Sequence, residues 1–176
     1  WNENGESVIG MSGELVCVKP FPSMPISFWN DDEGSKYQEA YFEDFPGVWT
    51  HGDYVEITVN GGAIIYGRSD TTLNPGGVRI GTAEIYRAVE NMSNIEDTIV
   101  VGKPSDGDVD IVLCVKLVDG VTLDSEMQDN ICRIIRSKTT PRHVPKYIFS
   151  VTDIPYTLSG KKVEKAVLYT IIGKKI

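Results

Sequence analysis

The segment from Gly67 to Tyr86 constrains the fold more than any other part of this 176-residue sequence. It holds four glycines and a proline between a short apolar run and an amphipathic stretch, and neither a helix nor a strand tolerates such a composition in its interior. The spacing of apolar residues also changes across this segment. We therefore expect it to separate two parts of the chain that fold differently.

Upstream of the segment, alternating apolar residues predict strands over 14–19, 54–59 and 63–66, and a spacing of four predicts a helix over 31–42. Downstream, helices are predicted over 82–92, 124–138 and 162–172, with Thr82 and Asp124 as N-caps. Strands are predicted over 95–103, 110–117 and 146–151. This order predicts an α+β fold with a domain boundary near Asp70: a β-rich end of a larger domain over 1–69, and a small domain with a short sheet flanked by helices over 70–176.

Composition excludes several classes of function. The formal net charge of -8 argues against a general binder of nucleic acid or anionic membranes, and no apolar run reaches the length of a membrane span. Three widely spaced cysteines and two distant histidines support neither a zinc site nor a cysteine–histidine nucleophile, so no metal site is expected. The acidic clusters at 31–33 and 106–110 are interpreted as solvated turns, and the default location is the cytoplasm.

Three short stretches contain residues suited to chemistry, although each also has an ordinary structural explanation. Gly76-Gly77 lets another molecule approach bare backbone, and arginines near it suit phosphate or carboxylate, yet most glycine-rich loops are surface turns. The Gly-Asp pair ending at Asp53 is a common turn. The stretch from Pro155 to Lys161 places a lysine in a loop, where most lysines are simply solvated.

Taken together, these stretches resemble the core motifs of adenylate-forming (AMP-forming) acyl-CoA synthetases. The matching residues are Gly67-Arg68-Ser69-Asp70, Leu73-Asn74-Pro75-Gly76-Gly77-Val78-Arg79, Thr82-Ala83-Glu84-Ile85 and Pro155-Tyr156-Thr157-Leu158-Ser159-Gly160-Lys161. The glycine-rich part is most similar to the acetoacetyl-CoA synthetase branch of that family. His51 before Gly52, and Glu164 three residues after Lys161, depart from the commonest family pattern but fit that branch.

The resemblance implies roles in a first half-reaction, in which ATP and a carboxylic acid form an acyl-adenylate. Asp53 would accept hydrogen bonds from the ribose hydroxyls, and Arg68 would contact the ribose or phosphate of ATP/AMP. Lys161 would be the catalytic cation between the substrate carboxylate and the α-phosphate. Asp70 would be the hinge about which the small domain moves.

The resemblance also implies a second half-reaction, in which the thiol of coenzyme A takes the acyl group. Gly76 and Gly77 would face the pantetheine, where a side chain would block its path. Arg79 and Arg136 would lie near the pantetheine and the phosphates of coenzyme A. Mg²⁺ is expected to accompany ATP but not to be bound by residues of this chain.

The phosphate-binding loop and the acid pocket of that family have no counterpart in the sequence, so we expect them in an N-terminal domain that these 176 residues do not include. The predicted function is that of a fragment of an acid–thiol ligase that acts on acetoacetate, with the isolated chain inactive. Two alternatives remain: a fragment of a short-chain synthetase for acetate or propionate, or a non-catalytic interaction module.

Overall fold

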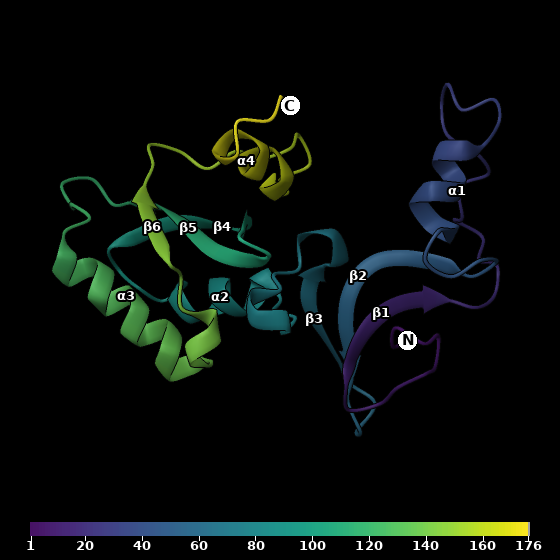
Figure 1. Cartoon of the computed structure of the whole chain (residues 1–176), viewed down its shortest axis with the longest axis horizontal. Coiled ribbons are helices and arrows are strands. Elements are labelled where there is room, and N and C mark those ends of the chain that lie inside the picture. Colours follow the sequence, from purple (N-terminus) through teal and green to yellow (C-terminus); the bar gives the residue numbers. More distant parts are fainter. Residues whose placement is uncertain (176) are drawn as a thin grey trace. The chain divides into compact units, whose positions relative to one another are not determined.

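The protein, analysed as a computed structural model that describes residues 1–175, consists of two compact units, Trp1–Asp70 and Thr71–Ile176 (Figure 1). The division falls within one residue of the expected boundary near Asp70. The chain is α+β, as the sequence predicted. None of the helices among the described residues is long and apolar enough to cross a membrane.

The first unit is a small antiparallel sheet with one helix. Its sheet has the order β1-β2-β3, and a tight turn at 58–62 connects the last two strands. The elements are β1 (Ser12–Cys17), α1 (Ser35–Phe42), β2 (Trp49–Ile57) and β3 (Ala63–Arg68), followed by a single 3-10 turn, η1 (Ser69–Thr71). Helix α1 packs on the start of β2 through Trp49, which is 4% exposed and stacks on Tyr41 with a centroid distance of 3.7 Å.

Helix α1 is four residues shorter at its start than predicted. The carboxylate of Asp31 accepts hydrogen bonds from the backbone N–H groups of Lys36 (3.0 Å) and Tyr37 (2.8 Å), which are unpaired at a helix start. Asp31 is buried rather than solvated, so its interpretation as part of a solvated turn is wrong. Burial opposes ionisation, but these backbone hydrogen bonds outweigh it and lower the pKa of Asp31.

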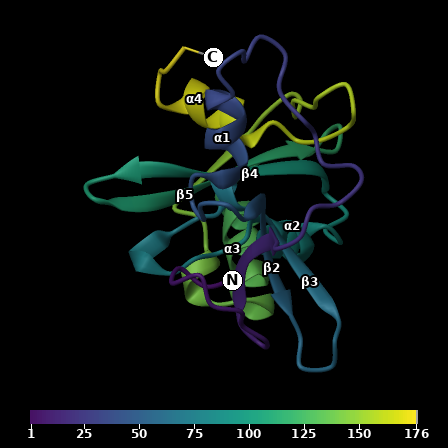
Figure 2. The ribbon, with the colours of Figure 1, turned by 90° about the vertical axis from the view of Figure 1, so that its right-hand side faces the viewer.

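The second unit is a three-stranded sheet with helices on both faces (Figure 1). Strands β4 (Ile95–Ser105) and β5 (Asp108–Leu117) form a long antiparallel hairpin, and β6 (Tyr147–Ser150) pairs in parallel with β5. The remaining elements are the short turn η2 (Pro75–Gly77), α2 (Thr82–Val89), α3 (Ser125–Lys138), the short turn η3 (Pro141–His143) and α4 (Glu164–Ile171). Figure 2 shows the hairpin lying between α4 on one side and α2 and α3 on the other.

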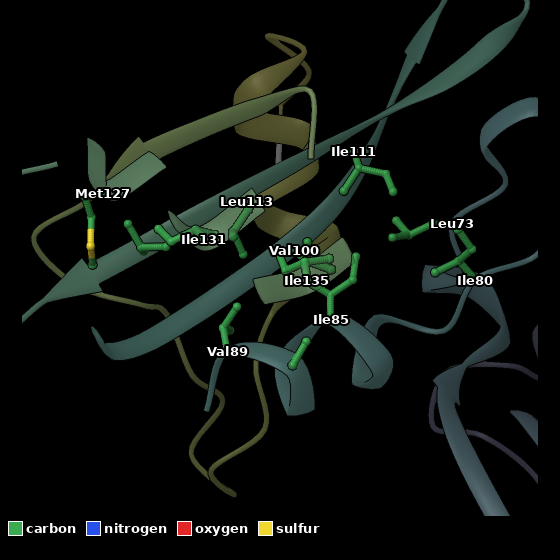
Figure 3. Close-up of a cluster of buried hydrophobic side chains, with 12 residues drawn as sticks. Leu73, Ile80, Ile85, Val89, Val100, Ile111, Leu113, Met127, Ile131 and Ile135 are labelled. Atoms are coloured by element: carbon green, nitrogen blue, oxygen red, sulfur yellow. The ribbon is translucent and has the colours of Figure 1, made fainter. Parts of the chain in front are cut away.

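Apolar side chains along the hairpin point alternately to its two faces and form two apolar layers. One face of the sheet packs on α2 and α3 through residues such as Val100, Leu113 and Ile131, all fully buried (Figure 3). The opposite face, through Ile99, Val112 and their neighbours, packs on α4. Because β-strand side chains point alternately to the two faces, one hairpin serves both layers. Cys114 lies in the second layer and is the buried thiol that its apolar neighbours indicate.

Two local predictions in this unit need correction. Gly81, not Thr82, is the N-cap of α2, and its N–H donates to the Glu84 carboxylate at 2.9 Å. Asp110 is not a solvated acid of a turn, since it is partly buried and forms an ion pair with Lys146 at 2.8 Å. Asp108 is exposed, as expected, but it also accepts two backbone hydrogen bonds. The second predicted cap, Asp124, is confirmed, since its carboxylate accepts from the N–H of Met127 at 2.8 Å.

Candidate functional site

The first unit brings together the three residues predicted to bind nucleotide and to act as the hinge. Asp53 on β2 and Arg68 on β3 are direct partners across the sheet, and Arg68 Nη1 lies 3.5 Å from Asp53 Oδ1. Arg68 Nε lies 3.5 Å from Asp70 Oδ1, in the η1 turn. The guanidinium therefore lies between two carboxylates, an arrangement that holds both in defined positions.

Gly52 makes this arrangement possible. Its φ is +78°, and a Cβ atom at this position would lie 2.6 Å from Arg68 Nη2. Arg68 Nη1 also donates to the carbonyl of His51 at 3.0 Å, so the guanidinium lies across bare backbone. Position 52 thus favours glycine, because a side chain would strain the backbone and occupy the space of the Arg68 guanidinium.

Glu14 on β1 supports the same segment from the other strand. Its carboxylate accepts from the N–H of Gly52 at 3.0 Å and from the hydroxyl of Ser69. Desolvation by burial raises the pKa of Glu14, partly offset by these two hydrogen bonds. Nothing in the sequence marks Glu14 as part of this site, because a glutamate within a predicted strand gives no motif signal.

In the second unit, the loop that carries Lys161 is closed by its own hydrogen bonds. The backbone N–H of Thr157 donates to the Lys161 carbonyl at 2.8 Å, and the Lys161 N–H donates to Thr157 Oγ1 at 3.0 Å. Gly160 turns the chain with a φ of +77°. The Thr-x-Ser-Gly-Lys pattern is therefore a compact turn, in which the threonine hydroxyl substitutes for a backbone acceptor.

The residues that flank Lys161 are anchored to the body of the unit. Lys162 Nζ lies 2.7 Å from Asp97 Oδ1, donates to the carbonyl of Thr98, and lies 4.4 Å from the centre of the Tyr86 ring. The Tyr156 hydroxyl donates to Asp97 Oδ2, and this contact raises the pKa of Tyr156 to about 12.

The ammonium of Lys161, by contrast, is exposed and has no hydrogen-bond or ion-pair partner within residues 1–175. Lysines are found at positions 161, 162 and 165, and the sequence alone does not explain why the first should differ from the others. The structure shows how Lys161 and Lys162 differ: the ammonium of Lys162 has a structural role, and that of Lys161 does not. Glu164 also has a structural contact, since its carboxylate accepts from the Tyr86 hydroxyl at 3.0 Å.

The glycine-rich loop is closed by Leu73 and Ile80, which pair backbone to backbone at 2.9 and 2.8 Å and are each 1% exposed. Figure 3 shows both side chains at the edge of the core. Gly76 and Gly77 lie at the exposed tip, with φ values of +58° and +75°. A Cβ atom on Gly77 would meet nothing within 4 Å, so the backbone at this position is open to another molecule.

Two side chains that the sequence analysis did not select hold the Gly76 peptide. Asp108 Oδ1 accepts from the Gly76 N–H at 2.7 Å, and Arg142 Nη1 donates to the Gly76 carbonyl at 3.3 Å. Arg79 and Arg136, which were selected, are both exposed, Arg79 in the same loop and Arg136 on α3. Asp108 and Arg142 are 32 and 66 residues from Gly76, which explains why no local pattern could indicate them.

The described residues contain no group of three or more histidine, cysteine, aspartate or glutamate side chains able to hold a metal ion.

No protein-family model matches the chain. The sequence is, however, 52% identical to "Acetoacetyl-coenzyme A synthetase" of Rhizobium meliloti (strain 1021) over 176 residues, which is all of this chain and 27% of that protein. It is also 52% identical to "Acetoacetyl-CoA synthetase" of Xenopus tropicalis over 178 residues, or 26% of that protein. The chain thus spans about a quarter of the length of these relatives.

A solved structure, "Acetoacetyl-CoA Synthetase from Streptomyces lividans", superposes with a TM-score of 0.91 at 44% sequence identity. The superposition covers 99% of this chain and 26% of that one. Sequence and structure therefore agree with the resemblance that the motifs indicated, including its acetoacetyl branch.

Proposed function

This chain corresponds to the C-terminal part of an adenylate-forming acyl-CoA synthetase, and from that premise we propose that the complete enzyme joins acetoacetate to coenzyme A with the use of ATP. The identity of about one half to acetoacetyl-CoA synthetases supports the acid. ATP and coenzyme A are substrates in this proposal. A cytoplasmic location, expected from the sequence, remains a prediction.

In the first half-reaction, a carboxylate oxygen of acetoacetate attacks the α-phosphorus of ATP, and the bond from this phosphorus to the bridging oxygen of pyrophosphate breaks. Two anions must approach each other, and the Lys161 ammonium offsets their repulsion and the charge that develops in the transition state. Asp53 accepts hydrogen bonds from the ribose hydroxyls, a geometry suited to a carboxylate. Arg68, between Asp53 and Asp70, orients Asp53 and contacts the nucleotide.

In the second half-reaction, the sulfur of coenzyme A attacks the acyl carbonyl, the thiol loses its proton, and AMP leaves. The pantetheine arm lies along the open backbone of Gly76 and Gly77. Arg79 and Arg136 supply cations for the anionic part of coenzyme A. Asp70 is the hinge that allows the unit Thr71–Ile176 to present first Lys161 and then the glycine loop.

One observation supports this proposal above the others: the Lys161 ammonium, which has no partner among residues 1–175, stands on a loop whose flanking residues Tyr156 and Lys162 are fixed. A lysine that was only a solvated surface residue would not need an anchored residue on each side of its loop. A lysine that must meet a transient negative charge needs both a defined position and a free ammonium.

The experiment is Lys161→Ala in the complete synthetase, with the two half-reactions measured separately. Adenylation is followed by pyrophosphate release, and thioester formation is started from preformed acetoacetyl-adenylate. We expect adenylation to fall at least about a hundredfold while thioester formation stays within about twofold. Lys19→Ala, which removes an exposed lysine in the first unit, is the matched control.

The alternatives give different results in the same assays. A short-chain synthetase would show a higher kcat/KM for acetate or propionate than for acetoacetate. An interaction module would show no effect of Lys161→Ala on either half-reaction. We also expect the isolated chain to release no pyrophosphate from ATP and acetoacetate, and steady release would contradict this proposal.

A further inference from the structure

The β4–β5 hairpin carries an anchoring carboxylate at each end, and each anchors a different loop. At one end is Asp97, whose register partner is Lys116 near the end of β5. Its two oxygens hold Lys162 and Tyr156, the residues on either side of the Lys161 loop. Burial alone would raise the pKa of Asp97, but hydrogen bonds from Lys162, Tyr156 and the Thr98 N–H lower it, so the carboxylate is charged at neutral pH.

At the other end is Asp108, whose register partner is Ser105. One of its oxygens accepts both from the Gly76 N–H and from the Val109 N–H, each at 2.7 Å. Hydrogen bonds from these N–H groups lower the pKa of Asp108. With Arg142 on the Gly76 carbonyl, both polar groups of this residue are held by side chains from outside its loop.

The two ends are far apart on a rigid element. Asp97 and Ser105 are eight residues apart on β4, which corresponds to about 26 Å at roughly 3.3 Å per strand residue. The register between them is unbroken, and both faces of the hairpin are covered by apolar layers. The Lys161 loop and the glycine loop therefore do not lie side by side, because they are held at opposite ends of the hairpin.

We propose that Asp97 and Asp108 are positioning residues, Asp97 for the adenylation step through the Lys161 loop and Asp108 for the thioester step through the Gly76 loop. This inference rests on the proposed function, which assigns one loop to each half-reaction. Neither carboxylate touches substrate. Each acts by holding a loop in the geometry that its half-reaction requires, where small displacements reduce rates strongly.

The test uses Asp97→Ala and Asp108→Ala in the complete synthetase, with the two half-reactions measured as for Lys161. We expect Asp97→Ala to lower adenylation about tenfold or more while thioester formation from preformed adenylate stays within about twofold. Asp108→Ala is expected to give the opposite pattern, with a raised KM for coenzyme A. General loss of stability would lower both half-reactions together, so the ratio between them reports positioning.

Conservative and control variants sharpen the result. Asp108→Asn keeps an oxygen that can accept from the Gly76 N–H, so it should restore most of the thioester step. Glu96 is the acid next to Asp97, but it pairs with Lys116 at 2.8 Å rather than with the loop. Glu96→Ala should therefore leave both half-reactions unchanged. Asp119→Ala, an exposed acid beyond the end of β5, should do the same.

The outcomes separate this inference from the proposed function. Suppose that Lys161→Ala loses adenylation, but that Asp97→Ala and Asp108→Ala either lower both half-reactions equally or lower neither of them. The positioning roles are then wrong, and the proposed function stands. If the unmodified synthetase forms no acyl-adenylate, or Lys161→Ala retains full adenylation, the proposed function itself fails.

Discussion

Replacing Gly77 by alanine tests whether open backbone in the glycine loop is used for binding. Gly77 has a φ of +75° and no atom within 4 Å of a Cβ built on it, so the methyl group would cause backbone strain but no clash within the chain. A non-glycine residue in the left-handed region costs about 1–2 kcal/mol. We therefore expect a modest fall in the free energy of unfolding.

The effect on chemistry should be confined to one half-reaction. If the pantetheine arm lies on this backbone, one added methyl group in a close contact costs about 1–3 kcal/mol, or a roughly 5- to 150-fold fall in kcat/KM for coenzyme A. Adenylation from ATP and acetoacetate should stay within about twofold of the unmodified enzyme.

The matched control is Gly120→Ala, in the turn after β5. Gly120 has a φ of +83° and equally open surroundings, so the strain should be the same, and the residue has no expected role in binding. The assay compares kcat/KM for coenzyme A in both variants together with their urea unfolding midpoints. If Gly77→Ala lowers thioester formation no more than Gly120→Ala does, pantetheine does not lie on this backbone.

Three further predictions concern stability. Ile131→Ala, at a fully buried position between α3 and the sheet, should lower the free energy of unfolding of the second unit by about 2–5 kcal/mol in urea titrations. Thr50→Val should raise the free energy of unfolding by about 1 kcal/mol, since the buried Thr50 hydroxyl has no hydrogen-bond partner in the described part of the chain; a fall would mean that the hydroxyl is satisfied. The Glu84 carboxylate lies 3.2 Å from His143, and its pKa is lowered from the ordinary glutamate value, because hydrogen bonds from His143 and Gly81 outweigh its burial. A lowered folded-state pKa stabilises the fold above the ordinary glutamate pKa, and this stabilisation is lost as the pH falls through the lowered pKa. Glu84→Gln should therefore be less stable than the parent at pH 7, with a difference that shrinks as the solution is made acidic.

Much of the fold follows from local patterns in the sequence. The α+β class and the order of the elements in the second half come from apolar spacing, and Asp124 was identified as a cap from its position alone. Predictions were wrong where a side-chain contact overrides the local pattern. Asp31 starts helix α1 later than its apolar spacing indicates, and Asp110 forms an ion pair with a lysine 36 residues away.

The candidate site divides in the same way. Motif resemblance selected Asp53, Arg68 and Asp70, and the structure places them in one cluster with Gly52 beneath the guanidinium. Resemblance could not select Arg142, because its contact with Gly76 depends on how η3 packs against the glycine loop.

The sequence by itself determined which chemical groups are available: a lysine in a loop, bare glycines in another loop, and an arginine two residues before an aspartate. Their types and short spacings are local properties, and local backbone preferences act on neighbouring residues alone. The tertiary structure decided which groups are free and which are held. Lys162 and Lys161 are adjacent in sequence, yet only the fold brings Asp97 to the first and leaves the second without a partner within residues 1–175. Such distinctions depend on contacts between residues distant in the chain, and these exist only once the sheet has formed and its two faces are covered.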